Sequence, residues 1–378
     1  MRSATAAVAV DAGRPFSLRE VRLEEPRHAE VLVRTAGTGI CHTDLICRDQ
    51  CFPVPLPAVL GHEGAGVVEE VGPGVHDLAP GDRVVLSFNS CGGCGPCASG
   101  RPAYCGDFLA RNFSGTRPDG TTPLHLTTPA PDGRRTPVHG VFFGQSSFAT
   151  HAIVTRRSVV KVDTVLPLEL LGPLACGFQP GAGAVLNSLR CPPGSSVAVF
   201  GAGAVGCGAV MAAAVASCTT IAVLGRNPSR PARAKSVGAT HTIDLTAPDP
   251  VAELRALTGG SGVAYSVEAT GAPGVLRQAV DCLAPEGVCG LLGAAAPGTE
   301  VRLDRSGLLF GRQVRGIVEG DATPAVFVPV LLDLHRTGRF PFDRLISLYP
   351  LGQINRAVAD MRAGHVVKPV LTFLGGPA

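Results

Sequence analysis

A glycine-rich segment in the middle of the chain constrains the fold more than any other feature of the sequence. Gly201-Ala202-Gly203-Ala204-Val205-Gly206 follows the apolar residues 197–200 and opens an Ala-rich stretch at 205–216. A GxGxxG sequence between a buried strand and a helix permits the tight turn that brings a pyrophosphate to the helix N-terminus. We therefore expect a dinucleotide at this turn, with Gly201, Gly203, Val205 and Gly206 as binding residues.

The pattern of apolar and turn-forming residues changes near residue 177. Before it, short alternating segments separated by Gly and Pro predict an antiparallel, partly barrel-like domain. After it, strands alternate with helices, which predicts a parallel, doubly wound sheet. We predict an α/β protein with domains at 1–176 and 177–318 and a tail, 319–378, that packs back on the first domain. The expected strands are 5–10, 30–35, 65–71, 83–88, 151–154, 197–200, 220–224, 264–268 and 288–292, and a polar surface loop is expected at 116–136.

Charge and hydropathy argue against two classes of partner. The 378 residues include 33 Lys+Arg and 30 Asp+Glu, and this even balance does not favour nucleic acid or an anionic membrane. The apolar runs fall well short of the roughly 18 to 20 residues that span a bilayer. The first residues lack the features of a signal peptide. We therefore expect a cytoplasmic location.

The cysteines indicate metal binding. Thirteen is an odd number, which argues against a disulfide framework. Cys91, Cys94, Cys97 and Cys105 follow a CxxCxxCx7C pattern with Gly and Pro between them. Small turn formers allow four thiolates to converge on one zinc ion, and a closed four-sulfur shell predicts a structural role. Iron–sulfur ligation by a similar run of cysteines remains the alternative.

A second possible metal set is spread along the chain. Cys41, His62 and Cys176 each end an apolar segment beside Gly or a turn. Two thiolates, one imidazole and an open fourth position would describe a catalytic zinc site that polarises an alcohol or carbonyl oxygen. Spacing alone does not bring these three residues together, because each of them is also common in protein cores.

The motifs together resemble one known family. GICHTD, GHEGAGVVEEVG, the four-cysteine loop, GDRVV, LACGF and GAGAVG occur in the order seen in zinc-dependent medium-chain alcohol dehydrogenases. Longer stretches, such as CHTDLICRDQCFPVPLPAVLGHEGAG and HGVFFGQSSFATHAIV, look most like the aryl (benzyl) alcohol dehydrogenase branch. The resemblance covers essentially the whole chain. It implies a GroES-like catalytic domain, a Rossmann cofactor domain and two zinc ions per chain.

The resemblance also implies roles for individual residues. Cys41, His62 and Cys176 match the catalytic zinc ligands, Thr43 the hydroxyl that hydrogen-bonds the substrate oxygen, and Asp44 the residue that orients His62. Glu63 would lie close behind the metal. Many relatives carry a relay histidine where this chain has Ile46. We therefore expect the proton to leave through Thr43 and the cofactor ribose, assisted by His42, which also matches a pyrophosphate-contacting position.

The residues after the second strand of the cofactor domain favour NADP(H) over NAD(H). NAD-binding versions place an acidic residue at the end of this strand to bind the adenosine ribose. Here the strand ends in Gly225-Arg226-Asn227, and no acidic residue occurs between Gly201 and Ile243. The guanidinium groups of Arg226 and Arg230 can pair with a 2′-phosphate, which a carboxylate would repel. Arg233 and Lys235 are expected on a solvated helix face, and Lys368 matches a cofactor-phosphate position.

With these parts, the expected activity is hydride transfer between an aromatic or allylic primary alcohol and the nicotinamide. Rough alignment with the family places Phe88, Phe142, Phe143 and Val318 in the substrate pocket. The alternatives are a biosynthetic NADPH-dependent reductase of carbonyl or iminium groups, a thiol-dependent formaldehyde dehydrogenase, and a zinc- and nucleotide-binding protein without catalysis. A homodimer through the sheet edge of the second domain is expected, and a tetramer stays open.

Overall fold

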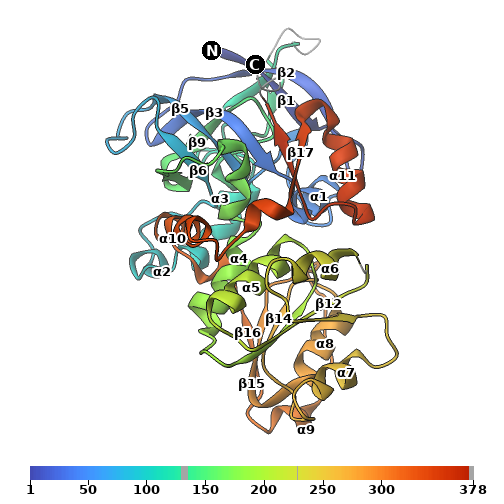
Figure 1. Ribbon diagram of the computed structural model, residues 1–378. Helices are drawn as coiled ribbons and strands as arrows, with labels where there is room; N and C mark the ends of the chain where they lie inside the picture. The colour runs from blue at the N-terminus through green and yellow to red at the C-terminus, as the bar shows by residue number, and fades with distance from the viewer. Residues whose placement is uncertain (129–134, 228, 374–378) are drawn as a thin grey trace.

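Three sheets organise the computed structural model, which describes residues 1–128, 135–227 and 229–373. Two mainly antiparallel sheets form the upper half of Figure 1. One parallel sheet with its helices forms the lower half. Helices α2 (Gly95–Ala98), α4 (Gln179–Gly183) and α10 (Pro324–Arg336) lie at the level between the two halves. The predicted fold class, a GroES-like domain with a Rossmann-type domain, is confirmed.

The upper half is built from short strands, as their alternating sequence predicts. One sheet has the order β4-β1-β2-β7-β8 and the other the order β10-β6-β5-β3-β18-β17, with β9 also pairing with β3. The bounds are β1 Arg2–Ala9, β2 Ser17–Leu23, β3 Glu30–Gly39, β4 Ala58–Val59, β5 Gly64–Val71, β6 Arg83–Leu86, β7 Leu124–Leu126, β8 Pro137–Val138, β9 His151–Thr155, β10 Val159–Lys161, β17 Ile346–Pro350 and β18 Lys368–Thr372. Helices α1 (His42–Arg48) and α3 (Phe108–Phe113) accompany them.

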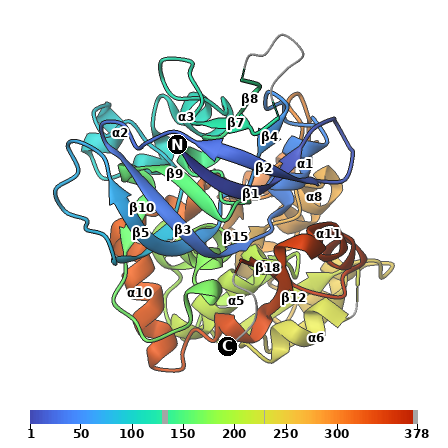
Figure 2. The ribbon, with the colours of Figure 1, turned by 90° about the horizontal axis from the view of Figure 1, so that it is seen from above.

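The tail of the chain joins the upper half. β18 pairs antiparallel with β3, and β17 pairs parallel with β18. Figure 2 shows α11 (Ile354–Ala363) close to β18. The expected boundaries at residues 176 and 318 stay predictions, but the pairing of β18 with β3 is the contact that a returning tail would make.

The lower half is a parallel sheet of order β13-β12-β11-β14-β15-β16, the 3-2-1-4-5-6 order of doubly wound dinucleotide-binding folds. Buried aliphatic side chains fill its central strands because helices cover both faces. The strands are β11 Ser196–Phe200, β12 Thr220–Gly225, β13 His241–Asp244, β14 Val263–Glu268, β15 Leu283–Leu291 and β16 Gln313–Gly316. The helices are α5 Ala204–Val215, α6 Ser229–Lys235, α7 Pro250–Ala256, α8 Pro273–Asp281 and α9 Arg305–Leu308.

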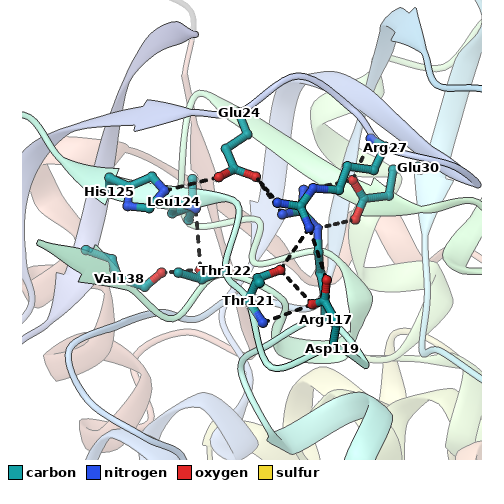
Figure 3. Close-up of polar contacts among 10 residues, drawn as sticks. All are labelled: Glu24, Arg27, Glu30, Arg117, Asp119, Thr121, Thr122, Leu124, His125 and Val138. Atoms are coloured by element: carbon teal, nitrogen blue, oxygen red, sulfur yellow. Dashed lines mark hydrogen bonds and ion pairs between the residues drawn. The ribbon is translucent and has the colours of Figure 1, made fainter. Parts of the chain in front are cut away.

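The segment expected as a polar surface loop, 116–136, is partly built into the fold, so that expectation was too simple. β7 lies inside it and pairs with β2. Figure 3 shows the reason: the buried Arg117 donates to both carboxylate oxygens of Glu30, at 2.7 and 2.9 Å, and to Glu24 at 2.7 Å. A guanidinium with this many charged partners can be buried, so a polar sequence does not imply a solvated loop. Residues 129–134 lie outside the described residues.

Among the described residues, no helix is long and apolar enough to cross a membrane.

Candidate active site

The fold brings together the three residues that spacing alone could not assemble. Cys41 precedes α1, His62 precedes β5, and Cys176 lies just before α4. Their ligand atoms and a carboxylate oxygen of Glu63 all lie within 4.8 Å of one another. We call Cys41, His62 and Cys176 the catalytic cluster, after the role proposed for them below. They come from three separate segments of the chain.

Asp44 organises the cluster from the first turn of α1. Its carboxylate accepts hydrogen bonds from the backbone of Cys41 at 2.8 Å and Gly61 at 3.0 Å, and it lies 2.9 Å from Nδ1 of His62. Asp44 therefore fixes the orientation and tautomer of the imidazole. Nε2 of His62 is buried without a hydrogen-bond partner. This free nitrogen beside two sulfurs fits a metal ion held by Cys41, His62 and Cys176.

The protonation of the cluster follows from its burial and from its internal contacts. A hydrogen bond from Cys176 lowers the pKa of the Cys41 thiol well below its usual value, and the same contact, together with burial, raises the pKa of Cys176. Burial opposes the charged form of His62, but the charge and hydrogen bond of Asp44 outweigh burial and raise the pKa of His62. A divalent cation bound between the two sulfurs would favour the thiolate form of both.

Glu63 and Lys368 form a buried ion pair behind the cluster. The Lys368 ammonium donates to Glu63 at 2.8 Å and to the carbonyl oxygen of Ile40 at 3.0 Å. Burial raises the pKa of Glu63 to about 7, although Lys368 acts in the opposite direction. The structure gives Lys368 these two acceptors, and its contact with a cofactor phosphate stays a prediction.

The residues expected to move the proton lie at the start of α1. Thr43 places its hydroxyl 3.6 Å from the sulfur of Cys41 and is half-buried. His42, beside it, is exposed, whereas Ile46 packs against the apolar core of the upper half. Ile46 has no group that can carry a proton. A proton that leaves Thr43 for solvent therefore has to pass through a different group.

The four cysteines of the contiguous motif also converge. Their sulfurs lie within 4.8 Å of one another, with Cys91 to Cys97 at 3.9 Å and Cys94 to Cys105 at 4.0 Å. Four sulfurs about 2.3 Å from one zinc ion would be separated by about 3.8 Å, so the residues fit a single tetrahedral ion. Backbone hydrogen bonds from Cys94 and Gly93 lower the pKa of Cys91 to about 6, which favours the thiolate. A multi-iron cluster with its own sulfides would need a wider separation.

Phenylalanine rings surround one side of His62. Phe143 stacks on the imidazole with the ring centres 4.4 Å apart, and Phe142 meets it edge-on at 5.5 Å. Phe88, Phe142 and Phe143 are buried, as a pocket wall or a core would both require, and Val318 is 37% exposed. Three further rings join this group in the structure and were missed in the sequence: Phe52, Phe108 and Phe113. The local sequence around these three residues does not predict the group, because the rings that they contact come from other segments of the chain.

The expected dinucleotide turn has the required shape. Gly201 adopts a φ of +107°, and α5 begins at Ala204. A Cβ on Gly206 would lie 1.8 Å from the carbonyl oxygen of Gly201, so only glycine fits there. Gly203 and Val205 lie at the N-terminus of α5, whose free N–H groups and dipole favour a phosphate.

The basic residues after β12 differ in their surroundings. Gly225 ends the strand and Arg226 is exposed beyond it. Arg230 instead donates to the carbonyl oxygen of Met361 at 2.5 Å, at the end of α11, and burial lowers its pKa. Arg226 is therefore the better placed of the two to meet a ligand at this edge of the sheet.

Glu319 and Gln145 are the site residues that the sequence did not reveal. Glu319 lies 3.8 Å from the sulfur of Cys176 and 3.5 Å from the amide of Gln179, and burial raises its pKa to about 8. Gln145 is fully buried and links the backbone of His62, Gly64 and Ser87. Both residues are far in sequence from the residues they contact, so no local pattern marks them.

Comparisons with known proteins agree with this geometry. Residues 27–164 match the family model of the alcohol dehydrogenase GroES-like domain, and residues 204–334 match that of the zinc-binding dehydrogenase. A geraniol dehydrogenase from Castellaniella defragrans is 49% identical over 98% of both chains.

Solved structures show the same likeness. A zinc-binding-domain alcohol dehydrogenase protein from Burkholderia ambifaria is 53% identical with a TM-score of 0.94, covering 99% of this chain and 100% of its own. A benzyl alcohol dehydrogenase from Acinetobacter calcoaceticus is 44% identical with a TM-score of 0.93 at the same coverage. With both family models matched in order and the cysteine and histidine cluster assembled between them, the chain belongs to the zinc-dependent medium-chain alcohol dehydrogenases.

Proposed function

We propose that this alcohol dehydrogenase acts on aromatic or allylic primary alcohols and on the matching aldehydes. The observation that carries the proposal is the group of phenylalanine rings beside His62, which Phe143 anchors by stacking on the imidazole. Such rings bury a planar, apolar substrate and offer little to a small or charged one. The relatives named for geraniol and benzyl alcohol support the same substrate class.

We further propose two zinc ions per chain. Cys91, Cys94, Cys97 and Cys105 would hold a structural ion, and Cys41, His62 and Cys176 a catalytic one. The bound catalytic ion supplies a Lewis acid that lowers the energy of the alkoxide. Asp44 keeps Nε2 of His62 free for this role, and the Lys368–Glu63 pair balances the charge behind the cluster.

In this proposal the Thr43 hydroxyl accepts the proton of the substrate alcohol, and the ribose of a bound cofactor would offer the next proton acceptor. His42 is the exposed neighbour that takes the proton to solvent, in place of a relay residue at Ile46. The apolar rings would exclude water from the carbinol carbon, and a bound nicotinamide would supply the hydride acceptor. Glu63 stays behind the cluster and takes no part in the transfer.

NADP(H) is the cofactor we favour, with the pyrophosphate at the Gly201–Gly206 turn and the 2′-phosphate at Arg226. The exposed guanidinium and the lack of an acidic residue at the end of β12 support this choice. Arg230 donates a hydrogen bond to Met361, so we assign Arg230 a smaller part in binding the 2′-phosphate than the sequence suggested.

We also propose a homodimer through β16. This strand lies at the edge of the parallel sheet, and Val314 on it is exposed, as are Leu309 and Phe310 just before it. An apolar edge strand of this kind invites pairing with a second copy. A cytoplasmic location stays an expectation from the sequence.

One set of kinetic measurements tests the substrate and cofactor together. The purified enzyme is assayed with benzyl alcohol, geraniol and ethanol, each with NAD⁺ and NADP⁺, and in the reverse direction with the aldehydes. We expect kcat/KM for the two large alcohols to exceed that for ethanol by at least about 100-fold, since burying several more methylenes strengthens binding by about 3 kcal/mol. Equal values would refute the pocket, and a clear preference for NAD⁺ would refute the cofactor choice.

A further inference from the structure

A short turn connects the two cysteine clusters, which are otherwise separate. Residues 318–323, here called the bridging turn, follow β16 and precede α10. Glu319, Gly320 and Asp321 all adopt positive φ values, of 51°, 70° and 52°. Two non-glycine residues in this conformation cost roughly 1 to 3 kcal/mol each, and they persist only where the surroundings hold them.

One side of the bridging turn is held by the four-cysteine loop. The hydroxyl of Tyr104, next to Cys105, donates to the carboxylate of Asp321 at 2.5 Å and lies 3.3 Å from the carbonyl oxygen of Gly316. The hydroxyl of Thr323 donates to the carbonyl oxygen of Gly100 at 2.9 Å. The turn is therefore attached to the loop through Asp321 and Thr323.

The other side of the bridging turn is packed on the residues that follow Cys176. The amide of Asn187 donates to the carbonyl oxygen of Gly320 at 3.2 Å. A Cβ added to Gly183 would lie 2.1 Å from that oxygen, so backbone meets backbone here. The turn cannot slide toward α4 without a clash, and its position is set by the loop on the opposite side.

Glu319, which belongs to the bridging turn, contacts the catalytic cluster. Glu319 lies 3.8 Å from the sulfur of Cys176 and 3.5 Å from Gln179. A carboxyl group at this distance contacts one proposed metal ligand directly, so a small movement of the turn changes the polar surroundings of that sulfur.

We propose that the four-cysteine loop positions the catalytic centre, with Tyr104 as a positioning residue that acts through Asp321 and Glu319. The loop would then do more than stabilise its own segment, because it fixes the turn whose carboxyl group reaches Cys176. This inference rests on the proposed role of Cys176 as a metal ligand.

The test uses the full-length protein loaded with cadmium-113 at both metal sites. The two sites differ in their sulfur count, so their NMR signals are separate. We expect Tyr104→Phe and Glu319→Gln to move the signal of the site with two sulfurs and one nitrogen, and the double variant to move it no further than Glu319→Gln alone. Tyr349→Phe is the matched control, because that hydroxyl donates to Asp360 at 2.8 Å, away from both clusters. It should leave this signal in place.

Kinetics give a second readout. Losing the bond from Tyr104 should lower kcat/KM for the alcohol about fivefold to tenfold, which is the effect of one hydrogen bond of ordinary strength. The loss should be non-additive with Glu319→Gln, as expected for residues that act through one another. Asp321→Asn keeps an acceptor for Tyr104 and should behave like the unmodified protein, whereas Asp321→Ala should reproduce Tyr104→Phe.

The inference is overturned if Tyr104→Phe changes only the unfolding temperature, as Tyr349→Phe would, or if the effects of Tyr104→Phe and Glu319→Gln on the cadmium signal simply add. Its failure can be told apart from failure of the proposed function. A protein that oxidises no alcohol but shows the coupled cadmium shifts would refute the proposed substrates and keep the positioning role.

Discussion

The two cysteine clusters reach similar compactness by opposite routes. Cys91 to Cys105 lie within fifteen residues, and a single loop rich in Gly brings their sulfurs together. Cys41, His62 and Cys176 are spread over more than a hundred residues, and three segments on different elements have to be placed before they meet. The first cluster depends on local chain geometry, whereas the second depends on the whole fold. A local cluster should therefore contribute to stability, and a distributed one should contribute mainly to chemistry.

The largest expected effect comes from removing a ligand of the distributed cluster. His62→Ala should lower kcat/KM by about 1,000-fold or more, because loss of a metal-assisted step removes several kcal/mol of transition-state stabilisation. Metal analysis should show a fall from two ions to one, with the unfolding temperature little changed. If His62→Ala unfolds the protein instead, the division between a chemical and a structural cluster is wrong.

The contiguous cluster should respond in the opposite way. Cys94→Ser should destabilise the protein by about 3 kcal/mol, because structural zinc contributes directly to folding. The midpoint of thermal unfolding would fall by roughly 6 to 12 °C, measured by circular dichroism. The remaining folded protein should still bind one zinc ion and retain activity within about tenfold. Complete loss of activity in protein that stays folded would contradict this separation.

Asp44 offers an intermediate test, because it contacts the distributed cluster without belonging to the proposed ligand set. Asp44→Asn keeps the shape of the side chain but weakens its hold on Nδ1 of His62. Outer residues of this kind typically change metal affinity by about 10-fold to 100-fold. Competition with a chelator, followed by metal analysis, measures the change. Zinc at the four-cysteine loop should be released at the unmodified rate, which provides an internal control.

The smallest expected effect comes from Glu24, which lies outside both clusters, so its substitution should change stability without changing activity. Although partial burial opposes it, hydrogen bonds from Arg117 and His125 lower the pKa of Glu24. A carboxyl group whose pKa is lower in the folded state stabilises the protein above its ordinary pKa of 4.5, and this contribution is lost as the pH falls from that value through the lower pKa of the folded state.

Glu24→Gln should therefore lower stability at neutral pH, and the loss should shrink steadily as the pH is lowered below 4.5, as measured by urea unfolding. Activity per folded molecule should not change at neutral pH. A loss of stability that does not change with pH would mean that the charge of Glu24 is not the cause.

Local patterns predicted much of this fold correctly. The turn at Gly201–Gly206 implies its flanking strand and helix, and β11, α5 and β12 lie within one or two residues of the predicted segments. Short-range turn geometry and the alternation of apolar residues are properties of consecutive residues, so they can be read directly. The expected loop at 116–136 failed for the same reason, since the partners of Arg117 lie about 90 residues earlier in the chain.

The candidate site divides along the same line. The four cysteines could be grouped by their spacing. Cys41, His62 and Cys176, and with them Thr43 and Asp44, could be assigned only through the family resemblance. No local sequence pattern predicts Glu319 and Gln145 as site residues. Their roles depend on contacts with Cys176 and His62, which lie far from them in the sequence.

The sequence by itself determined the elements and the local cluster, because backbone propensity, hydrophobic periodicity and short loops act over a few residues. Only the tertiary structure decided which side chains share a site. The pairing of β18 with β3 places Lys368 behind Glu63, and the bridging turn places Glu319 beside Cys176. Such contacts depend on how separate layers pack, and packing is a property of the complete chain.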